Sequence, residues 1–204
     1  MIFHKYRMIW TGIPKNASTT IHAALRNPTD HQHDHYPLVD DYRRNDSELM
    51  DLYKNVTIVR NPYDRFVSAT WQSRRDDWEV RKDWDINEVF TYEYFTMPSE
   101  NGGTINEIYI PQHKFICFGK KILADKILRY ETLDKDWKEF ITEYNETADF
   151  KLPERLPTHN QSGNRKPWKE ELKALSQENL DLVNKVYRLD FEIFGYDMID
   201  KVPK

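Results

Sequence analysis

The sequence has a single cysteine, Cys117, so an intrachain disulfide cannot form. A reducing compartment is therefore the simpler expectation, with this thiol buried as a small apolar group. No apolar run approaches the length of a membrane span, and residues 1–7 lack the apolar core of a signal peptide. The chain as given is expected to be a soluble cytoplasmic protein without membrane association, unless a leader or an anchor has been removed from it.

Excess basic charge is also missing. The chain has 30 Lys and Arg against 34 Asp and Glu, which gives a net charge of −4. This balance argues against a nucleic-acid partner, and it requires any anion site to be a local cluster of cations and backbone N–H groups. No repeat or linker divides the 204 residues. We therefore expect a single domain over residues 1–204, long enough to bury a sizeable core.

A polar turn at residues 14–20 follows the first apolar run and is typical of an anion site. The pattern predicts a strand over residues 6–13 and a helix over residues 20–26. A helix N-terminus favours a phosphate or sulfate through its exposed N–H groups and its dipole. Lys15 adds a cation, and hydroxyls come from Ser18, Thr19 and Thr20. The alternative is an ordinary turn with a Ser or Thr cap. A Walker A loop is disfavoured, because Gly12 stands alone and Lys15 precedes the hydroxyls.

A second strand–turn–helix unit follows at residues 55–71. The strand over residues 55–60 is rich in β-branched residues, and Asn61 and Pro62 can cap and start the helix after it. Arg60 closes the strand, where a charge normally needs a partner, and Ser68 falls on about the second helical turn. Two such units predict an α/β fold with a mainly parallel sheet and ligands at the carboxyl ends of its strands.

The rest of the chain predicts further elements. A helix is expected over residues 85–97 and a strand over residues 122–130. Thr132 can cap the helix after that strand, and Ser176 can start the last helix. Residues 145–167 are polar and contain three prolines, which predicts a long loop of the kind that is often functional.

Together, the two anion motifs resemble those of the sulfotransferases. Residues 13–20 are similar to the 5′-phosphosulfate loop of that family, P-K-x-[GA]-S-[TS]. Residues 58–69 are similar to its 3′-phosphate motif, V-R-[ND]-P-x-x-R-x-x-S. The carbohydrate sulfotransferases are the closest branch, including the uronyl 2-O-sulfotransferases and their bacterial relatives. Weaker matches in the same order lie at residues 110–112, 128–136 and 187–196. The resemblance implies a P-loop-like, three-layer α/β fold with helices flanking the central sheet.

The resemblance implies transfer of a sulfuryl group from 3′-phosphoadenosine 5′-phosphosulfate (PAPS) to a hydroxyl of a carbohydrate or another small acceptor, without a metal. Lys15 would stabilise the leaving group, and Arg60 and Ser68 would bind the 3′-phosphate. Positioning and charge stabilisation are what such a transfer needs. Many relatives have Gly where this chain has Ala17, and we expect Ala17 to avoid positive φ. The 5′-phosphosulfate would lie against Lys15, Asn16, Ala17, Ser18, Thr19 and Thr20.

An acceptor hydroxyl needs a general base, for which histidine suits neutral pH. The resemblance places the base between the two motifs, where His35 matches best and His33 is the alternative. In an extended segment these two side chains point the same way, so one can act while the other positions the acceptor. Two other interpretations stay open for the group His31, His33 and His35: a metal site and plain surface histidines. The prediction is that no metal is bound.

The polar loop at residues 158–166 is a third candidate. Relatives close such a loop over the nucleotide, and Arg165 and Lys166 are the cations that it would contribute here. A plain solvated loop is the alternative. For the whole chain, the alternatives to a sulfotransferase are a module that binds PAPS or its product without transfer, and an atypical P-loop kinase.

Overall fold

The computed structural model describes residues 1–25, 51–76, 78–81, 83–96, 108–157 and 166–204. The chain divides into two compact units. The first comprises residues 1–60 and 112–161, and the second comprises residues 61–111 and 162–204. The chain therefore passes from the first unit to the second directly after Arg60, inside the second anion motif.

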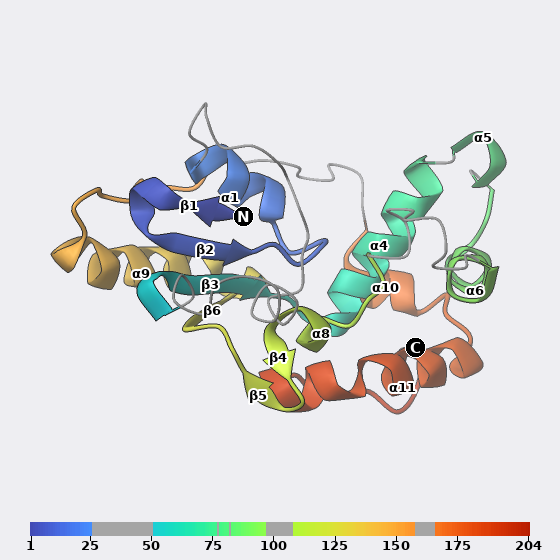
Figure 1. Ribbon diagram of the computed structural model, residues 1–204. Coiled ribbons are helices and arrows are strands. Elements are labelled where there is room, and N and C mark those ends of the chain that lie inside the picture. The colour runs from blue at the N-terminus through green and yellow to red at the C-terminus, as the bar shows by residue number, and fades with distance from the viewer. Residues whose placement is uncertain (26–50, 77, 82, 97–107, 158–165) are drawn as a thin grey trace. The chain divides into compact units, whose positions relative to one another are not determined.

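The first unit contains the mainly parallel sheet that the sequence predicts. Its strand order is β1-β2-β3-β6, in which β2 and β3 are parallel, β3 and β6 are parallel, and the edge strand β1 is antiparallel to β2. Helices follow the strands along the chain, so the mixed α/β class is confirmed. The four strands span Ile2–Phe3, Met8–Thr11, Lys54–Val59 and Lys126–Arg129 (Figure 1).

Two helices pack against one face of this sheet. They are α1, Ser18–Leu25, and α9, Leu133–Thr147. Their apolar residues recur at helical spacing, so each helix presents one stripe to the core. The cluster that they form with the strands is fully buried at its largest side chains, Trp10 and Trp137. Its other buried members are Phe3, Tyr6, Met8, Ile21, Leu25, Val56, Ile58, Leu128, Phe140, Ile141 and Leu152.

Short elements complete the first unit. The strand expected over residues 122–130 is two separate strands, because the chain leaves the hairpin of β4 and β5 before it enters the central sheet as β6. Cys117 in this hairpin is buried and forms no disulfide, as the sequence predicts. The short elements are the 3-10 helices η1, His4–Tyr6, and η3, Tyr130–Thr132, the helix α8, His113–Ile116, and the strands Cys117–Phe118 and Lys121–Ile122.

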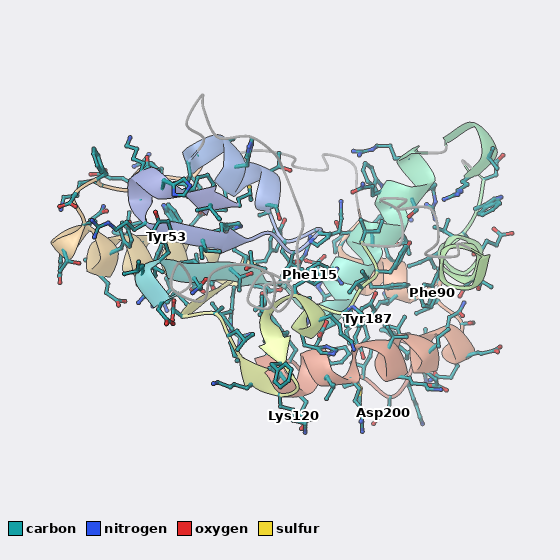
Figure 2. All side chains as sticks on the ribbon, viewed as in Figure 1. Tyr53, Phe90, Phe115, Lys120, Tyr187 and Asp200 are labelled. Carbon is teal, nitrogen blue, oxygen red and sulfur yellow. The ribbon has the colours of Figure 1, made fainter. Side chains whose placement is uncertain are left out.

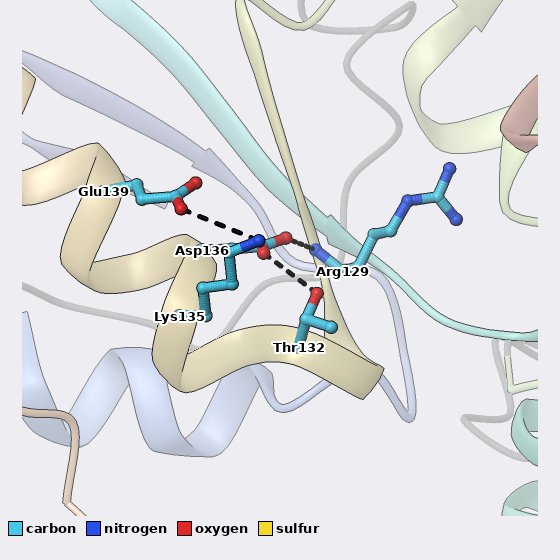
Figure 3. Close-up of polar contacts among 5 residues, drawn as sticks. All are labelled: Arg129, Thr132, Lys135, Asp136 and Glu139. Atoms are coloured by element: carbon cyan, nitrogen blue, oxygen red, sulfur yellow. Dashed lines mark hydrogen bonds and ion pairs between the residues drawn. The ribbon is translucent and has the colours of Figure 1, made fainter.

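The expected cap at Thr132 is wrong. Thr132 is in the N-cap position of α9, but its hydroxyl makes no capping bond. It instead donates to Asp136 Oδ1 at 2.9 Å. The other oxygen of Asp136 accepts from Arg129 N at 2.8 Å (Figure 3). Arg129 is the last residue of β6, and Asp136 lies in the first turn of α9. The Asp136 carboxylate therefore links the end of the strand to the helix across η3. The Lys135–Glu139 pair on the same helix is exposed and adds little stability.

The second unit is helical over the residues that the structure describes. The caps expected for α4 and α11 are confirmed: Asn61 Oδ1 accepts from Tyr63 N, and the Ser176 hydroxyl accepts from Asn179 N. Gly195, at φ 66°, then ends α11. Every helix in the described part of the chain is too short or too polar to cross a membrane. The helices are α4, Pro62–Asp76, α5, Trp78–Arg81, α6, Ile86–Thr96, α10, Trp168–Leu172, and α11, Gln177–Phe194.

A separate apolar core holds these helices together. Phe66 on α4 and Phe90 on α6 meet edge to face, with ring centroids 4.8 Å apart. Phe90 and Tyr187, labelled in Figure 2, are both fully buried. The hydroxyl of Tyr187 donates to Tyr109 O at 2.9 Å, which satisfies its polar end. The other buried members are Tyr63, Val67, Ala69, Ile86, Ile108, Leu172, Leu175, Leu180, Val183 and Phe191.

Tyr63 joins the start of α4 to the C-terminal segment. Its hydroxyl donates to Asn184 Oδ1 at 2.5 Å and accepts from Ile199 N at 2.9 Å. Its ring stacks on Trp168, at 5.8 Å between centroids. Burial raises the pKa of Tyr63 to about 12 from the ordinary 10.0; the bond from Ile199 N opposes this shift and the Asp200 carboxylate adds to it.

Replacing Tyr63 tests this contact. Because Tyr63→Phe leaves the Ile199 N–H and the Asn184 amide without their partner, we expect the free energy of unfolding to fall by about 1–3 kcal/mol near neutral pH. The pKa of Tyr63 is raised in the folded state, so the stability that its protonated hydroxyl contributes to the wild-type protein is lost as the pH rises from about 10 to about 12. The phenylalanine variant has no such loss. The stability gap between the two proteins should therefore narrow over that pH range.

The measurement is urea denaturation of both proteins from pH 7 upward. Tyr53→Phe is the matched control, because it removes a hydroxyl that contacts His4 Nδ1 in an exposed position. A gap between wild type and Tyr63→Phe that stays constant above pH 10 would contradict the role given to the buried hydroxyl.

Candidate anion-binding site

The loop between β2 and α1 has an unusual backbone. Lys15 has a φ of 70° and Ala17 has a φ of 60°, whereas Asn16 between them does not have a positive φ. The expectation that Ala17 avoids positive φ is therefore wrong. Alternation of this kind is typical of a concave nest that suits an anion, while the Asn16 N–H itself donates to Ile13 O at 3.2 Å. Helix α1 begins directly after it, at Ser18. Thr20 N and Ile21 N donate to Ala17 O, so the N–H groups of Ser18 and Thr19 are the ones at the start of α1 that have no acceptor within the helix.

Inward-facing side chains hold this loop in place. Asn16 is only 1% exposed, and its Nδ2 donates to Ile58 O at 2.8 Å and to Gln112 Oε1 at 2.6 Å. The hydroxyl of Ser18 donates back to Ile13 O at 3.0 Å. These bonds explain why two non-glycine residues keep a left-handed backbone, since such strain persists only where the surroundings fix it. They also show that Ser18 uses its hydroxyl proton within the loop.

Arg60 reaches the same loop from the end of β3. It is 3% exposed, and its Nη1 donates to Lys15 O at 2.8 Å. The guanidinium also lies over the ring of Tyr130, with Cζ 3.9 Å from the ring centroid. The partner that the sequence required for a charge at a strand end is thus the Lys15 carbonyl, supported by a cation–π contact. The structure thus joins the first motif to the arginine of the second.

Gln112 belongs to this site and was not among the predicted residues. It is fully buried, and its Oε1 accepts from Arg60 N at 2.9 Å while its Nε2 donates to Arg60 O at 2.8 Å. The same Oε1 accepts from Asn16, so one amide contacts both motifs. The short match at residues 110–112 was the available signal. A glutamine alone implies no chemistry, so the pattern did not select it.

The other predicted residues lie in different places. Lys15 and Thr20 are half-buried, and Thr19 is exposed. Ser68 is on the second turn of α4, in the second unit, and is 8% exposed. Lys166 is exposed, just before α10. His33, His35 and Arg165 lie outside the described residues, as does His31, so the metal interpretation of the histidines is untested. Elsewhere in the described ranges, His, Cys, Asp and Glu do not gather in groups of three or more that could hold a metal ion.

The strained backbone at Ala17 makes a testable prediction of unusual sign. A left-handed conformation costs a non-glycine residue about 1–2 kcal/mol, and glycine recovers this cost at the expense of a more flexible unfolded chain. Ala17→Gly is therefore expected to raise the free energy of unfolding by about 0.5–1 kcal/mol. Thermal and urea denaturation measure the change.

Ala23→Gly is the matched control. Ala23 is exposed on α1, where glycine should lower the free energy of unfolding by about 0.5–1 kcal/mol. Opposite signs for the two variants are the expected result. A loss of stability in both would mean that Ala17 is not strained.

Comparison with known proteins assigns the chain to a family. The family model described as "Sulfotransferase family" matches residues 1–197, which include both anion motifs. No curated protein and no solved structure matches the chain significantly. The match confirms the family that the two motifs resemble and extends over both compact units. The chain belongs to the sulfotransferase family.

Proposed function

We propose that this sulfotransferase takes its sulfuryl group from PAPS and transfers it in line to a hydroxyl of a carbohydrate or another small acceptor. The observation that carries the proposal is the hydrogen bond from Arg60 Nη1 to Lys15 O. This bond holds the cation of the second motif against the loop of the first. PAPS has anionic groups at both its 5′ and its 3′ positions, so it needs two neighbouring anion sites.

The residues in this region fit both anionic groups. The alternating backbone of residues 15–17 and the N-terminus of α1 supply N–H groups for the 5′-phosphosulfate, much as a P-loop cradles phosphates. Arg60 supplies a guanidinium whose planar set of donors suits a phosphate. We assign the 3′-phosphate to Arg60, with Ser68 as its second ligand. Thr19 and Thr20 in the first turns of α1 complete the 5′ side.

Lys15 is proposed to stabilise the negative charge that develops on the bridging oxygen as the S–O bond breaks. Lys15 is half-buried, and its positive φ makes it part of the alternating backbone of residues 15–17. Electrostatic stabilisation of developing charge is usually the largest single contribution of an enzyme to a transfer of this kind. Lys166, exposed at the end of the polar loop, and Arg165 before it are proposed to add charge over the nucleotide.

The acceptor hydroxyl would lose its proton to a histidine. His35 is the proposed base, and His33 is the proposed positioning partner or the alternative base. The support for this assignment is the resemblance of the segment between the two motifs, together with the pKa of imidazole, which lies close to neutral pH.

The donor assignment is tested with labelled PAPS and two variants. Lys15→Ala should lower kcat by about 100-fold or more, because the leaving group loses its cation. Arg60→Ala should raise the Kd for adenosine 3′,5′-bisphosphate about 10- to 100-fold, because a charge-assisted bond to the phosphate is lost. Lys54→Ala, at the exposed start of β3, is the matched control and should change neither quantity.

The outcomes separate the three functions. Unchanged transfer by Lys15→Ala would contradict the proposal. Tight binding of adenosine 3′,5′-bisphosphate without transfer to any of a broad panel of carbohydrate and small hydroxyl acceptors would favour a binding module. Turnover of ATP that depends on Mg²⁺ would favour a kinase. The labelled member of the panel identifies the class of acceptor.

The base is tested by separate substitutions at the two histidines. His35→Gln should lower kcat by about 100- to 10,000-fold and leave the Kd for adenosine 3′,5′-bisphosphate unchanged, because proton removal is lost while donor binding is kept. His33→Gln should have the smaller effect. His4→Gln, at an exposed residue in the described part of the chain, is the control. Full activity in both His33→Gln and His35→Gln would exclude this segment as the source of the base.

A further inference from the structure

Gln112 is a buried amide in a position where an apolar side chain would avoid the cost of removing polar atoms from water. Its side chain is fully buried, and its amide joins residues that are distant in the sequence, Asn16 and Arg60. A buried polar group of this kind is tolerated only when it is well hydrogen-bonded, and replacing it costs more than its net contribution because its partners remain buried. The residues that it contacts show what it does.

Gln112 continues the hydrogen bonding of β3 beyond the end of the strand. The last pair between β3 and β6 is Val59 with Arg129. At the next residue, Arg60 N donates to Gln112 Oε1 at 2.9 Å, and Gln112 Nε2 donates to Arg60 O at 2.8 Å. The side-chain amide therefore takes the place of a neighbouring strand. It fixes the backbone of Arg60 without contacting the guanidinium through these bonds.

These contacts also fix the orientation of both amides. Arg60 N can only donate and Arg60 O can only accept, so Oε1 of Gln112 must face the first and Nε2 the second. The Asn16 atom that meets Oε1 must then be the Nδ2 donor, which also reaches Ile58 O. This arrangement leaves Asn16 Oδ1 buried without a hydrogen-bond partner. An unsatisfied buried oxygen lowers stability, and here it accompanies the bond that joins the loop to Gln112 and so to Arg60.

Asn16 lies between the two strained residues of the loop, Lys15 and Ala17, which both have positive φ. Its anchored side chain therefore sets the position of the nest that they form. Through one oxygen atom, Gln112 holds this nest and the backbone of Arg60 at a fixed separation. The bond from Arg60 Nη1 to Lys15 O closes the same arrangement from the guanidinium side.

We propose that Gln112 is a positioning residue that sets the distance between the 5′-phosphosulfate loop and Arg60, so that both ends of one nucleotide are bound together. This inference rests on the proposed function, because that function assigns the two anion sites. It predicts a specific defect: each site still binds its own anion, but a ligand that must reach both sites at once binds poorly. A purely structural role would lower stability without this pattern.

The test compares ligands with one and with two phosphates. Gln112→Met keeps the length and approximate volume of the side chain and removes its amide hydrogen bonds. The probes are adenosine 3′,5′-bisphosphate, adenosine 5′-monophosphate and adenosine 3′-monophosphate, measured by calorimetry or ligand-detected NMR. We expect the Kd of the bisphosphate to rise about tenfold or more, because the linked sites no longer match its span. The Kd of each monophosphate should change less than threefold.

Thr57→Val is the matched control. Thr57 is fully buried on the same strand, and its hydroxyl donates to Thr11 O at 2.8 Å, at the end of β2, rather than to Asn16 or Arg60. It should lose stability to a similar extent and keep all three dissociation constants. Should Gln112→Met fail to fold, Gln112→Asn is the second variant. It keeps a buried amide but is one methylene shorter, so it cannot reach both Asn16 and the backbone of Arg60. It is expected to show the same selective loss of bisphosphate binding.

The result also separates this inference from the proposed function. Wild-type protein that does not bind adenosine 3′,5′-bisphosphate would contradict the proposed function itself. Wild-type binding together with an unchanged Kd in the folded Gln112 variants would overturn the positioning role alone. Equal weakening of all three ligands, or weakening of only one monophosphate along with the bisphosphate, would also overturn it, because Gln112 would then act on one site or on the fold in general.

Discussion

The first unit depends on one interaction, the contact between Arg60 and the carbonyl of Lys15. Lys15 has a positive φ, and its carbonyl oxygen accepts a hydrogen bond from Arg60 Nη1 at 2.8 Å. The contact pairs a strained turn with a buried charge, and the guanidinium also lies over the ring of Tyr130. Neither feature is favourable by itself, since a left-handed lysine is strained and a desolvated guanidinium is costly. Together they leave N–H groups and positive charge in one place.

Glycine is the usual means of forming such a turn, and this chain uses little of it. Residues 13–20 contain no glycine. Buried amides replace the conformational freedom that glycine would give: Asn16 is held at Ile58 O and at Gln112, which is itself held by the backbone of Arg60. A loop fixed in this way is formed before any ligand arrives. Less ordering is then needed on binding, at the cost of strain in the unliganded protein.

Local chemistry explains which features could be predicted. The features that were predicted correctly depend on residues a few positions apart. They are the caps at Asn61 and Ser176, the alternation of strands and helices, and the apolar stripes of α1 and α9. Ala17 was predicted wrongly because the bonds that hold its neighbour Asn16 come from residues 42 and 96 positions away. Gln112 could not be predicted because it binds the backbone N and O of Arg60. Every residue type has these groups, so the sequence gives no sign of the contact. Thr132 failed as a cap because its hydroxyl is oriented to donate to Asp136, one turn into the helix, and accepts no bond from the first N–H groups of α9.

The hydroxyl of Tyr63 also bears on where this domain ends. The family match stops at residue 197, whereas Ile199 N donates to Tyr63 and Ile199 O accepts from Asn184 Nδ2 at 2.9 Å. A fragment cut at the limit of the match would lack both backbone partners. Tyr63 and Asn184 would then lose the hydrogen bonds that they make to the backbone of Ile199, next to the first turn of α4. The hydrogen bonds of the second unit therefore extend past the last residue that the family model matches. A fragment that ends at residue 197 would have a less stable α4, the helix that carries Ser68.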